Sequence, residues 1–389
     1  MGKWIDCTIA DIGTVVGGAT PSTKKMENYE NGTIPWITPK DLSGFEGRYI
    51  SKGERNITEA GLKSCSTQLV PPHTVLFTSR APIGYVAIAE NEVCTNQGFK
   101  SVIPNKNTDY MFLYYLLKYN KDRIENMGSG TTFKEVSGNT MKGIAVKVPE
   151  DIKEQRAIAC ILSSIDDKIE LNNNINKNLE QQAFSLFCNL VTVSNGVQKV
   201  ADIADLNPTR SIKKNEYAGC IDMAKLSTTS SIPSCWEYKQ FTGGMKFTNG
   251  DTIMARITPC LENGKTAFIN FLENDEIAFG STEYIVLSPK KKVPAELLYC
   301  LVKYEPFVQF AVKHMNGSSG RQRVTADSIG SFELPLFSQE AMDNFAFLVH
   351  PYFEHIKYNA LENMDLLSLR DALLPKLMSG EIDVSNINL

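Results

Sequence analysis

Residues with the chemistry to contact nucleic acid stand in the segments of this sequence that are rich in turn-forming residues. Arginine can pair with guanine through two hydrogen bonds and glutamine with adenine, whereas lysine, serine, threonine and the amides of glycine-rich loops bind phosphate oxygens. In the first half of the chain these candidates are Lys24, Lys25, Lys40, Arg48, Ser79, Arg80, Gln97, Lys100, Thr131, Thr132 and Lys134. In the second half they are Arg210, Lys213, Lys214, Lys225, Arg256, Lys265, Ser281, Thr282, Glu283, Arg321, Gln322 and Arg323.

Each exposed lysine or arginine is weak evidence alone, because most such side chains are solvated surface. The strongest single candidate is Arg321–Arg323, which follows a Gly-Ser-Ser-Gly turn at 317–320. Glycines let backbone amides approach a phosphate, and the two arginines flank the turn.

No set of residues has the spacing of a known catalytic or nucleotide site. The stretch Glu262–Thr266 contains Gly-Lys-Thr, but a phosphate-binding loop needs a glycine where this chain has Pro259. Asn207–Thr209 lacks the second proline and the aromatic residue with which amino-methyltransferases hold a flipped base. Asp166 and Asp167 fall in the first turn of an expected helix, where acids stabilise the helix dipole. We therefore expect no catalytic residue and no cofactor bound by this chain.

The histidines and cysteines also lack the spacing of a metal or redox site. His350 and His355 are five residues apart, so they diverge on a helix. Nine cysteines are scattered singly, and their odd number suits a reducing compartment. We expect no bound metal.

Composition indicates an ordinary globular protein with two domains. The chain has 389 residues, of which 22% are charged and 42% hydrophobic, with no apolar run long enough to cross a membrane and no signal peptide. We expect a cytoplasmic protein. The formal net charge of −4 argues against a protein that binds nucleic acid with its whole surface, but it allows local basic patches.

The sequence contains two copies of the same series of segments. Leu113–Tyr119 (LYYLLKY) returns as Leu298–Tyr304 (LYCLVKY), and each copy opens alike with TIADIG or KVADIA. Short segments rich in β-branched and aromatic residues predict strands at Val75–Thr78, Tyr85–Ile88, Thr252–Ala255, Thr266–Phe271 and Tyr284–Leu287. The domains predicted by this pattern are mixed α/β, and the loops between matching segments differ between the copies.

Each copy is followed by a long helical region with apolar residues at alternating spacings of four and three. This spacing predicts that the two helices wrap around each other as a coiled coil, in which buried asparagines would set the register. The predicted seam comprises Ile165, Ile169, Asn172, Asn176 and Leu179 in the first helix and Tyr352, Ile356, Asn359, Asn363 and Leu366 in the second. The alternative is that these asparagines face solvent on a loosely packed amphipathic helix. The outer face could be solvated or could dock another subunit.

A break is expected inside each helical region. Pro351 would remove a backbone hydrogen bond from a helix interior, so we place it in the first turn of a new helix. Ser164 occupies the equivalent place in the first copy, with Asp167 three residues later as in a capping box. The predicted helices are 152–162, 165–190, 339–349 and 351–378.

The chain resembles the specificity subunit of type I restriction-modification systems over essentially its whole length. The resemblance is carried by IPWITPKDLSG (34–44), TSRAPIG (78–84), NQGFKSV (96–102), GSGTTFKEVSG (128–138), EQRAIACILSSIDDKIE (154–170) and LRDALLPKLMSGEI (369–382). It implies an α+β fold with two duplicated mixed α/β target recognition domains, separated by two long antiparallel helices that form a coiled-coil spacer in a pseudo-twofold arrangement. The implied boundaries are 1–150 and 195–338 for the recognition domains, 151–194 and 339–380 for the spacer regions, and 381–389 for a C-terminal tail.

The same resemblance implies a non-catalytic protein that reads an asymmetric, bipartite sequence in double-stranded DNA. Such a subunit recruits two methylation subunits, which use S-adenosylmethionine, and through them restriction subunits that use ATP and magnesium. No membrane partner is implied.

Two other functions stay open on the residues alone. The chain could be a duplicated coiled-coil scaffold that joins two proteins without reading DNA, which predicts binding with little dependence on salt or sequence. It could also be a catalytic nucleic-acid modifier with an unfamiliar site, although the expected cofactor, metal and nucleophile motifs are missing.

Overall fold

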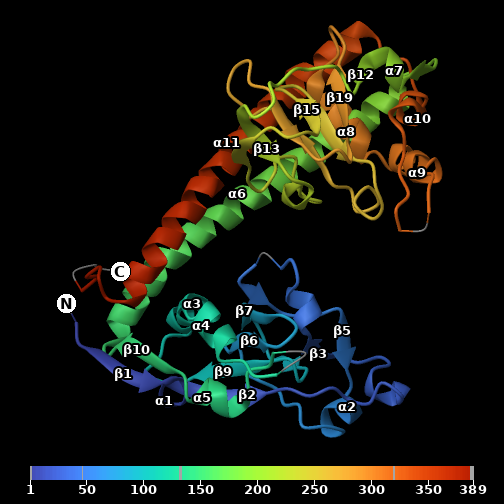
Figure 1. The fold of residues 1–389 in the computed structure, drawn as a ribbon. Helices are drawn as coiled ribbons and strands as arrows, with labels where there is room; N and C mark the ends of the chain where they lie inside the picture. The colour runs from blue at the N-terminus through green and yellow to red at the C-terminus, as the bar shows by residue number, and fades with distance from the viewer. Residues whose placement is uncertain (1, 46, 131–133, 319, 386–389) are drawn as a thin grey trace. The chain divides into compact units, whose positions relative to one another are not determined.

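The computed structural model describes residues 2–45, 47–130, 134–318 and 320–385. The chain divides into two compact units, of which the first comprises Met1–Asp167 with Leu367–Leu389 and the second Lys168–Leu366. Each unit contains a globular mixed α/β part and segments of two long helices, α6 (Ile152–Val193) and α11 (Gln339–Met378), as Figure 1 shows. The two ends of the chain therefore belong to the same unit.

The globular part of the first unit is built on three sheets. The main sheet has the order β2 (Gly13–Gly17), β9 (Lys100–Pro104), β6 (Val75–Ser79), β7 (Ile83–Ala89), β4 (Tyr49–Ile50). The smaller sheets are β5 (Arg55–Ile57), β3 (Ile34–Ile37), β8 (Cys94–Thr95) and the pair β1 (Trp4–Thr8), β10 (Ala145–Pro149). The helical segments are α1 (Ile9–Ile12), η1 (Met26–Asn28), η2 (Pro39–Leu42), α2 (Glu59–Lys63), α3 (Tyr110–Tyr119), α4 (Lys121–Asn126) and α5 (Gly138–Lys142).

The globular part of the second unit repeats this plan. Its main sheet has the order β12 (Ala204–Leu206), β19 (Tyr284–Pro289), β16 (Thr252–Ala255), β17 (Thr266–Phe268). The other sheets are β14 (Glu237–Gln240), β13 (Tyr217–Ile221), β18 (Ala278–Gly280), β15 (Met245–Phe247) and the pair β11 (Gln198–Lys199), β20 (Glu333–Leu334). The helical segments are α7 (Val200–Ile203), η3 (Met223–Lys225), α8 (Ala295–Lys303), α9 (Glu305–Lys313) and α10 (Ala326–Gly330).

The strand pairings confirm the predicted duplication. Strands β2, β9, β6 and β7 pair antiparallel in the same order as β12, β19, β16 and β17. The parallel pair of β3 with β8 has its counterpart in β13 with β18, and the pair of β1 with β10 in β11 with β20. The predicted strands all lie within or overlap observed ones, so their content of β-branched and aromatic residues indicated them correctly.

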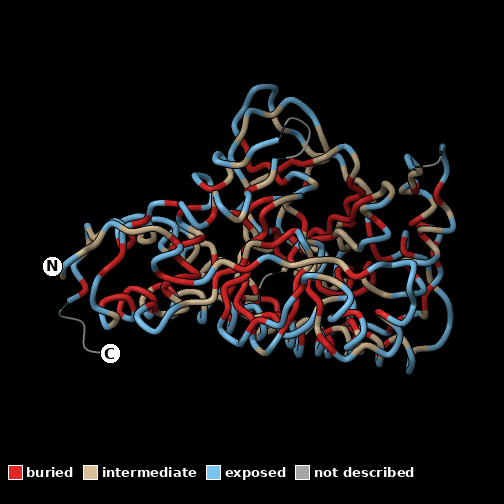
Figure 2. The backbone as a smooth tube through the Cα atoms, turned by 90° about the horizontal axis from the view of Figure 1, so that it is seen from below, coloured by how far each residue is buried: buried red, intermediate tan, exposed pale blue. Residues whose placement is uncertain are grey.

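Apolar burial explains where the helices lie. In the first unit the buried face of α3 (Leu113, Leu116 and Leu117) packs into a core that also contains Ile158 and Leu162 of α6. The core of the second unit contains the matching face of α8, together with residues from both α6 and α11. Figure 2 shows buried stretches of the backbone alternating with exposed ones along the chain. The long helices are therefore part of the domain cores as well as extensions from them.

The two long helices run antiparallel within each unit. In the second unit Asn172 pairs with Asn363 and Asn176 with Asn359, so an increase in one residue number accompanies a decrease in the other. In the first unit Arg370 of α11 binds Asp166 of α6, and the core of that unit contains Leu162 of α6 together with Leu377 of α11. The antiparallel pairing is therefore as predicted.

The predicted breaks inside the helical regions are wrong. Helix α6 continues through Ser164, whose hydroxyl donates to backbone carbonyls of the preceding turn and does not cap a new helix. Helix α11 likewise continues through Pro351. Val349, Phe353 and Ile356 are buried in the core on either side of this proline. Burying each of them stabilises the helix by roughly 1.5–3 kcal/mol, which together exceeds the roughly 3 kcal/mol that a proline costs in a helix interior.

Replacing Pro351 with alanine should therefore stabilise the second unit. The side chain is exposed, and the new backbone N–H could donate to the carbonyl of Phe347. We expect the free energy of unfolding, measured by urea denaturation, to rise by about 1–3 kcal/mol. The exposed His355→Ala change on the same helix is the control and should shift it by less than about 0.5 kcal/mol. A less stable P351A variant would show that the core packing requires the bend of a proline.

Candidate nucleic-acid interface

A carboxylate stands between two cations in the loops that border the main sheet of the first unit. Arg80 follows β6, Lys100 begins β9, and Glu135 lies in the glycine-rich loop before α5. The Glu135 carboxylate is 3.6 Å from Arg80 Nη1 and 3.6 Å from Lys100 Nζ. The side chains of Arg80 and Glu135 remain 35% and 41% exposed. We call these three residues the first loop site.

Backbone hydrogen bonds tie the three loops of this site together. Ser79 N donates to Gly98 O at 2.7 Å, and Val136 N donates to Ser79 O at 3.0 Å. Glu135 exchanges two further bonds with Ser129 across the glycine-rich loop, at 2.9 and 3.1 Å. The site is therefore held by the ends of strands that the core fixes in place.

The second unit has a tighter arrangement of the same kind. Arg323 Nε donates to both carboxylate oxygens of Glu283, at 3.0 and 2.9 Å, and its Nη2 donates to Oε1 at 2.6 Å. These bonds, together with the charges of Arg323 and Arg256, lower the pKa of Glu283. The Nε of Arg256 is buried and has no hydrogen-bond partner among the described residues. We call Arg256, Glu283 and Arg323 the second loop site.

The two loop sites occupy the same place in the duplicated framework. Val324 N donates to Arg256 O at 3.0 Å and Arg256 N donates to Glu283 O at 2.9 Å, which repeats the two bonds made around Ser79. The residue before the valine also pairs with the start of its own loop in both units. That residue is Glu135 in the first unit and Arg323 in the second, so equivalent positions carry opposite charges.

Sequence reasoning missed Glu135, because the candidates in its loop were chosen as hydrogen-bond donors. A signal was present, since Glu135 is the single acidic residue between Gly128 and Gly138. Its importance comes from contacts with Arg80 and Lys100, which are distant in the sequence.

Most of the other residues that were predicted to contact nucleic acid are on the surface. Exposed residues are Lys24, Lys25, Lys40, Gln97, Lys134, Lys213, Lys214, Thr282 and Arg321. Partly exposed ones are Lys225, Lys265, Ser281 and Gln322. Two of the lysines already have acidic neighbours, since Lys25 lies 3.5 Å from Glu27 and Lys40 lies 2.7 Å from Glu54. Thr131 and Thr132 lie outside the described residues.

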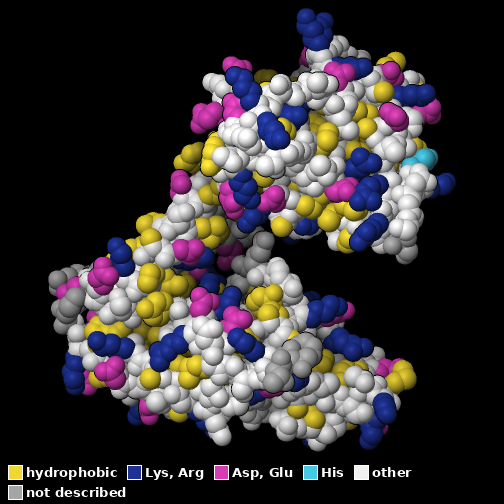
Figure 3. Space-filling model, viewed as in Figure 1, with side chains coloured by type: hydrophobic (Ala, Val, Ile, Leu, Met, Phe, Trp, Pro, Cys, Tyr) yellow, Lys and Arg dark blue, Asp and Glu magenta, His cyan; other side chains and the backbone are white. Residues whose placement is uncertain are grey.

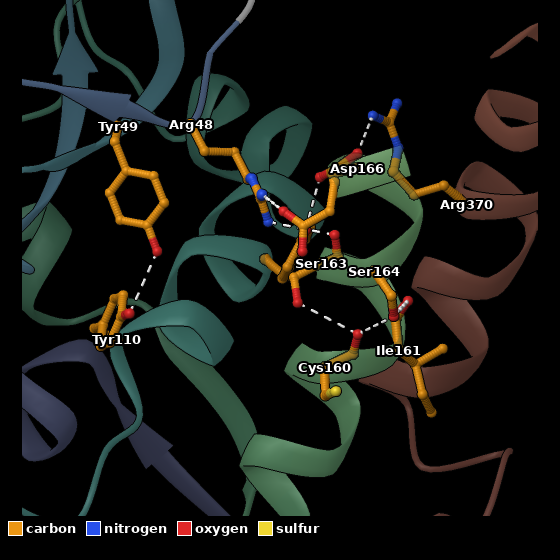
Figure 4. Close-up of polar contacts among 11 residues, drawn as sticks. Arg48, Tyr49, Tyr110, Cys160, Ile161, Ser163, Ser164, Asp166 and Arg370 are labelled. Atoms are coloured by element: carbon orange, nitrogen blue, oxygen red, sulfur yellow. Dashed lines mark hydrogen bonds and ion pairs between the residues drawn. The ribbon is translucent and has the colours of Figure 1, made fainter. Parts of the chain in front are cut away.

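Arg48 and Ser79 need correction, because neither is placed to contact nucleic acid. Ser79 is fully buried and its hydroxyl donates to Gly98 O. Arg48 is 7% exposed, and its guanidinium binds Asp167 and donates to the Ser163 carbonyl (Figure 4). A buried arginine needs a carboxylate and carbonyl partners, and helix α6 supplies them. Arg48 therefore fixes the globular part of the first unit to its helix.

The prediction that Arg210 contacts nucleic acid also needs correction. Its guanidinium binds both oxygens of Asp251, at 2.8 and 2.9 Å, and also Lys246 O and Ser288 Oγ. The side chain of Asp251 is 1% exposed, and burial raises the pKa of this carboxyl even though Arg210 opposes the effect. Arg210 is thus held inward as the partner of a buried acid.

The substitution Arg210→Ala should consequently lower the free energy of unfolding. Removing one partner of a buried ion pair leaves an uncompensated charge and costs about 3–5 kcal/mol. Thermal or urea unfolding of the full chain should register this loss, whereas Lys213→Ala, which removes an exposed charge nearby, should be almost neutral. A normally stable R210A variant with weaker DNA binding would restore the original prediction.

The four predicted seam asparagines are buried between the two helices of the second unit. Asn172 Nδ2 donates to Asn363 Oδ1 at 2.9 Å, and Asn359 Nδ2 donates to Asn176 Oδ1 at 2.8 Å. They do not face solvent. Of the apolar seam residues, Ile356 is buried and the partly buried ones are Ile165, Ile169, Leu179, Tyr352 and Leu366. The seam thus combines moderate apolar packing with two asparagine pairs.

The surface around these features carries both signs of charge. On the face drawn in Figure 3, lysine and arginine are interspersed with aspartate and glutamate. Within the described ranges, histidines, cysteines and acids form no group suited to a metal ion. In the described part of the chain, no helix is long and apolar enough to cross a membrane.

Comparison with known proteins identifies relatives along the whole chain. A family model described as the type I restriction modification DNA specificity domain matches residues 1–181. The chain is 34% identical to the type I restriction enzyme MjaIX specificity subunit of Methanocaldococcus jannaschii, over 99% of this chain and 94% of that protein. It is 32% identical to the EcoR124I/EcoR124II specificity subunit of Escherichia coli, over 45% and 43% of the two chains.

A solved structure shares the fold. The type I restriction-modification S subunit from M. genitalium superimposes with a TM-score of 0.61, covering 97% of this chain and 96% of that one at 17% identity. At this identity the likeness speaks for the fold alone, which it extends over both units.

Proposed function

We propose that this chain, which belongs to the family of type I restriction-modification specificity subunits, reads one half of a bipartite double-stranded DNA target with each of its globular domains. Specificity subunits provide DNA-target recognition within a restriction-modification complex and perform no catalytic step themselves. The recognition domains we infer are residues 1–150 and 195–338, with spacer regions at 151–194 and 339–380 and a tail at 381–389.

The observation that carries this proposal is a loop site that recurs in both units with opposite charges at one equivalent position, Glu135 and Arg323. Both sites combine one carboxylate with two cations at the same place in the duplicated framework. Sites of equal position but different donors and acceptors would read different base pairs, because base edges are distinguished by hydrogen-bond pattern. We therefore infer that the two half-sites differ and that the target is asymmetric.

The partners follow from the family and from the surface of α11. Phe347, Leu348 and Tyr358 are 80%, 46% and 63% exposed, and Pro351 lies between them on the same side of the helix. The opposite side is buried in the core, so this helix is apolar on two faces, which is typical of a helix covered on both sides. We infer that these four residues, the outer stripe, bind a methylation subunit.

The assembly we infer contains two methylation subunits and, where they are present, two restriction subunits. S-adenosylmethionine, ATP and magnesium would be bound by those partners and not by this chain. Because its substrate is cellular DNA and its nine cysteines are free, we also infer a cytoplasmic location.

The long helices would set the distance between the half-sites. The asparagine pairs support this role, since the hydrogen bond in each pair can form only in one register of the two helices. A fixed register gives a fixed helix overlap and hence a fixed gap in the DNA target.

Sequencing of modified bases in the source genome, with and without this gene, tests the function. Loss of methyladenine at one gapped, asymmetric motif is the expected result. If all methylation persists and the purified complex binds unrelated DNA equally well, the scaffold function would replace the proposed one.

A further inference from the structure

We propose that Arg323 reads a guanine in the half-site bound by the second domain, and that Glu283 is the positioning residue that orients the Arg323 guanidinium for this contact. The inference rests on the proposed function, because it names the base that the second loop site recognises.

Arg323 has N–H donors that its contacts within the described residues do not use. A guanidinium carries five N–H groups. Glu283 receives the Nε–H and one N–H of Nη2, and the Arg321 carbonyl receives one from Nη1 at 3.1 Å. Among the residues that the structure describes, one N–H on each terminal nitrogen is left without an acceptor. Guanine offers two acceptors, O6 and N7, on its major-groove edge, and arginine pairs with both at once.

The backbone of Arg323 is held in place by hydrogen bonds. Arg323 N and O each bond to Asn316 at 2.9 Å. On its other side, Thr258 N donates to Gln322 O at 3.1 Å and Val324 N donates to the carbonyl of Arg256 at 3.0 Å. The residue is thus fixed on both sides, and little conformational freedom remains to be lost on binding. A fixed donor pair can discriminate between bases, whereas a mobile one adapts to any acceptor.

The charge of Glu283 makes Arg323 better suited to contact a base than a phosphate. Arg323 lowers the pKa of Glu283, so this acid is ionised at neutral pH and the pair is electrically neutral. A phosphate that approached Arg323 would also approach the Glu283 carboxylate, which repels it. Neutral pairs release few counterions, so this contact should add sequence discrimination and little salt dependence.

The neighbouring Arg321 serves as the control residue when the role of Arg323 is tested. Its side chain is exposed, and the structure gives it no acidic partner among the described residues. It has the same charge and lies in the same loop, but it has no carboxylate to orient it. Arg321 is therefore suited to a phosphate contact that is independent of sequence.

The residue at the equivalent position of the first unit has the opposite hydrogen-bonding chemistry, which agrees with the role assigned to Arg323. Glu135 stands there, and a carboxylate accepts hydrogen bonds where Arg323 donates them. The first half-site should accordingly not carry a guanine that is read from this position.

The experiment uses the full chain assembled with its methylation subunits and the target identified from the modified bases. Affinity is measured for duplexes in which each base pair of both half-sites is changed in turn, at several salt concentrations. Arg323→Ala should weaken target binding about ten- to a hundredfold and abolish preference at one G·C pair only. Arg321→Ala should weaken all sequences alike and reduce the salt slope by about one.

Two further probes act at the atom level. Replacing that guanine with 7-deazaguanine, which lacks N7, should weaken wild-type binding but leave R323A binding unchanged. Glu283→Gln should relax the same single position and steepen the salt dependence, with Glu283→Asp restoring part of the preference. If R323A does not fold, the 7-deazaguanine comparison is made between the wild type and E283Q, and an equal effect of 7-deazaguanine on both would contradict the role of the Arg323–Glu283 pair.

The inference is overturned if R323A weakens every sequence equally, if no guanine is present in the second half-site, or if wild-type binding is indifferent to 7-deazaguanine. These results leave DNA recognition by the chain intact. A wild-type complex that cannot discriminate its target at all would instead remove the proposed function together with this inference.

Discussion

Deleting seven residues from both long helices should move methylation to a target whose half-sites are about three base pairs closer together. Seven residues correspond to about 10 Å of helix, and each base pair occupies about 3.4 Å of DNA. Seven residues are also close to two complete turns, so the helix faces return to within about 20° of their original direction. The domains and their loop sites should remain unchanged, so the bases of each half-site should be the same.

The antiparallel register defines which residues to remove. Asn172 faces Asn363 and Asn176 faces Asn359, so residues 168–174 of α6 lie opposite residues 361–367 of α11. Removing both stretches keeps Asn176 opposite Asn359. Sequencing of modified bases reports the new motif, and methylation of the original target should fall to background.

The single deletion in α6 is the control for this design. It removes Asn172, so that the buried amide of Asn363 loses its partner, and it brings Asp166 out of register with Arg370. A buried polar group without a partner costs about 1–3 kcal/mol. We expect it to abolish methylation without creating a new motif. A doubly deleted protein that methylates new bases at the old gap would disprove the spacer role of the helices.

Placing charges on the outer stripe should prevent assembly with the methylation subunit. Phe347→Asp combined with Tyr358→Asp removes two exposed aromatic side chains and introduces two carboxylates. Aromatic anchors at the centre of an interface commonly contribute about 2 kcal/mol or more each, so binding should weaken about a thousandfold. Size-exclusion chromatography and calorimetry of the reconstituted complex measure this loss.

The stability of the free chain separates assembly from folding. Both aromatic side chains lie on the exposed face of α11, so urea denaturation of the isolated subunit should be almost unchanged. Tyr238→Asp, at an exposed tyrosine on β14, is the matched control and should assemble normally. Normal assembly of the double variant would place the methylation subunit elsewhere.

Much of the architecture could be predicted from local patterns. The strands at Val75–Ser79 and Thr252–Ala255 and the helices at Tyr110–Tyr119 and Ala295–Lys303 follow from runs of β-branched residues and from apolar spacing. Duplication was visible because both copies keep these patterns. The family and its function were predicted correctly from motifs that extend over the whole chain.

The loop sites could be predicted only in part. Arg80, Lys100, Arg256, Glu283 and Arg323 were among the candidates, because donor chemistry can be read from residue type. Their grouping could not be predicted, since each site joins loops that are far apart in the sequence. Glu135 was missed for this reason, although it lies between two of the predicted cations.

The sequence by itself determined the duplicated mixed α/β plan, the long helices and the family, because these depend on periodic burial and on short motifs. Tertiary structure decided which arginines face outward, since Arg48 and Arg210 turn toward Asp167 and Asp251 and away from solvent. It also decided that α11 continues through Pro351, where packing on both sides outweighs a lost hydrogen bond. The physical reason is common to these cases: the environment of a side chain is set by neighbours that are distant in the sequence, and local patterns do not contain them.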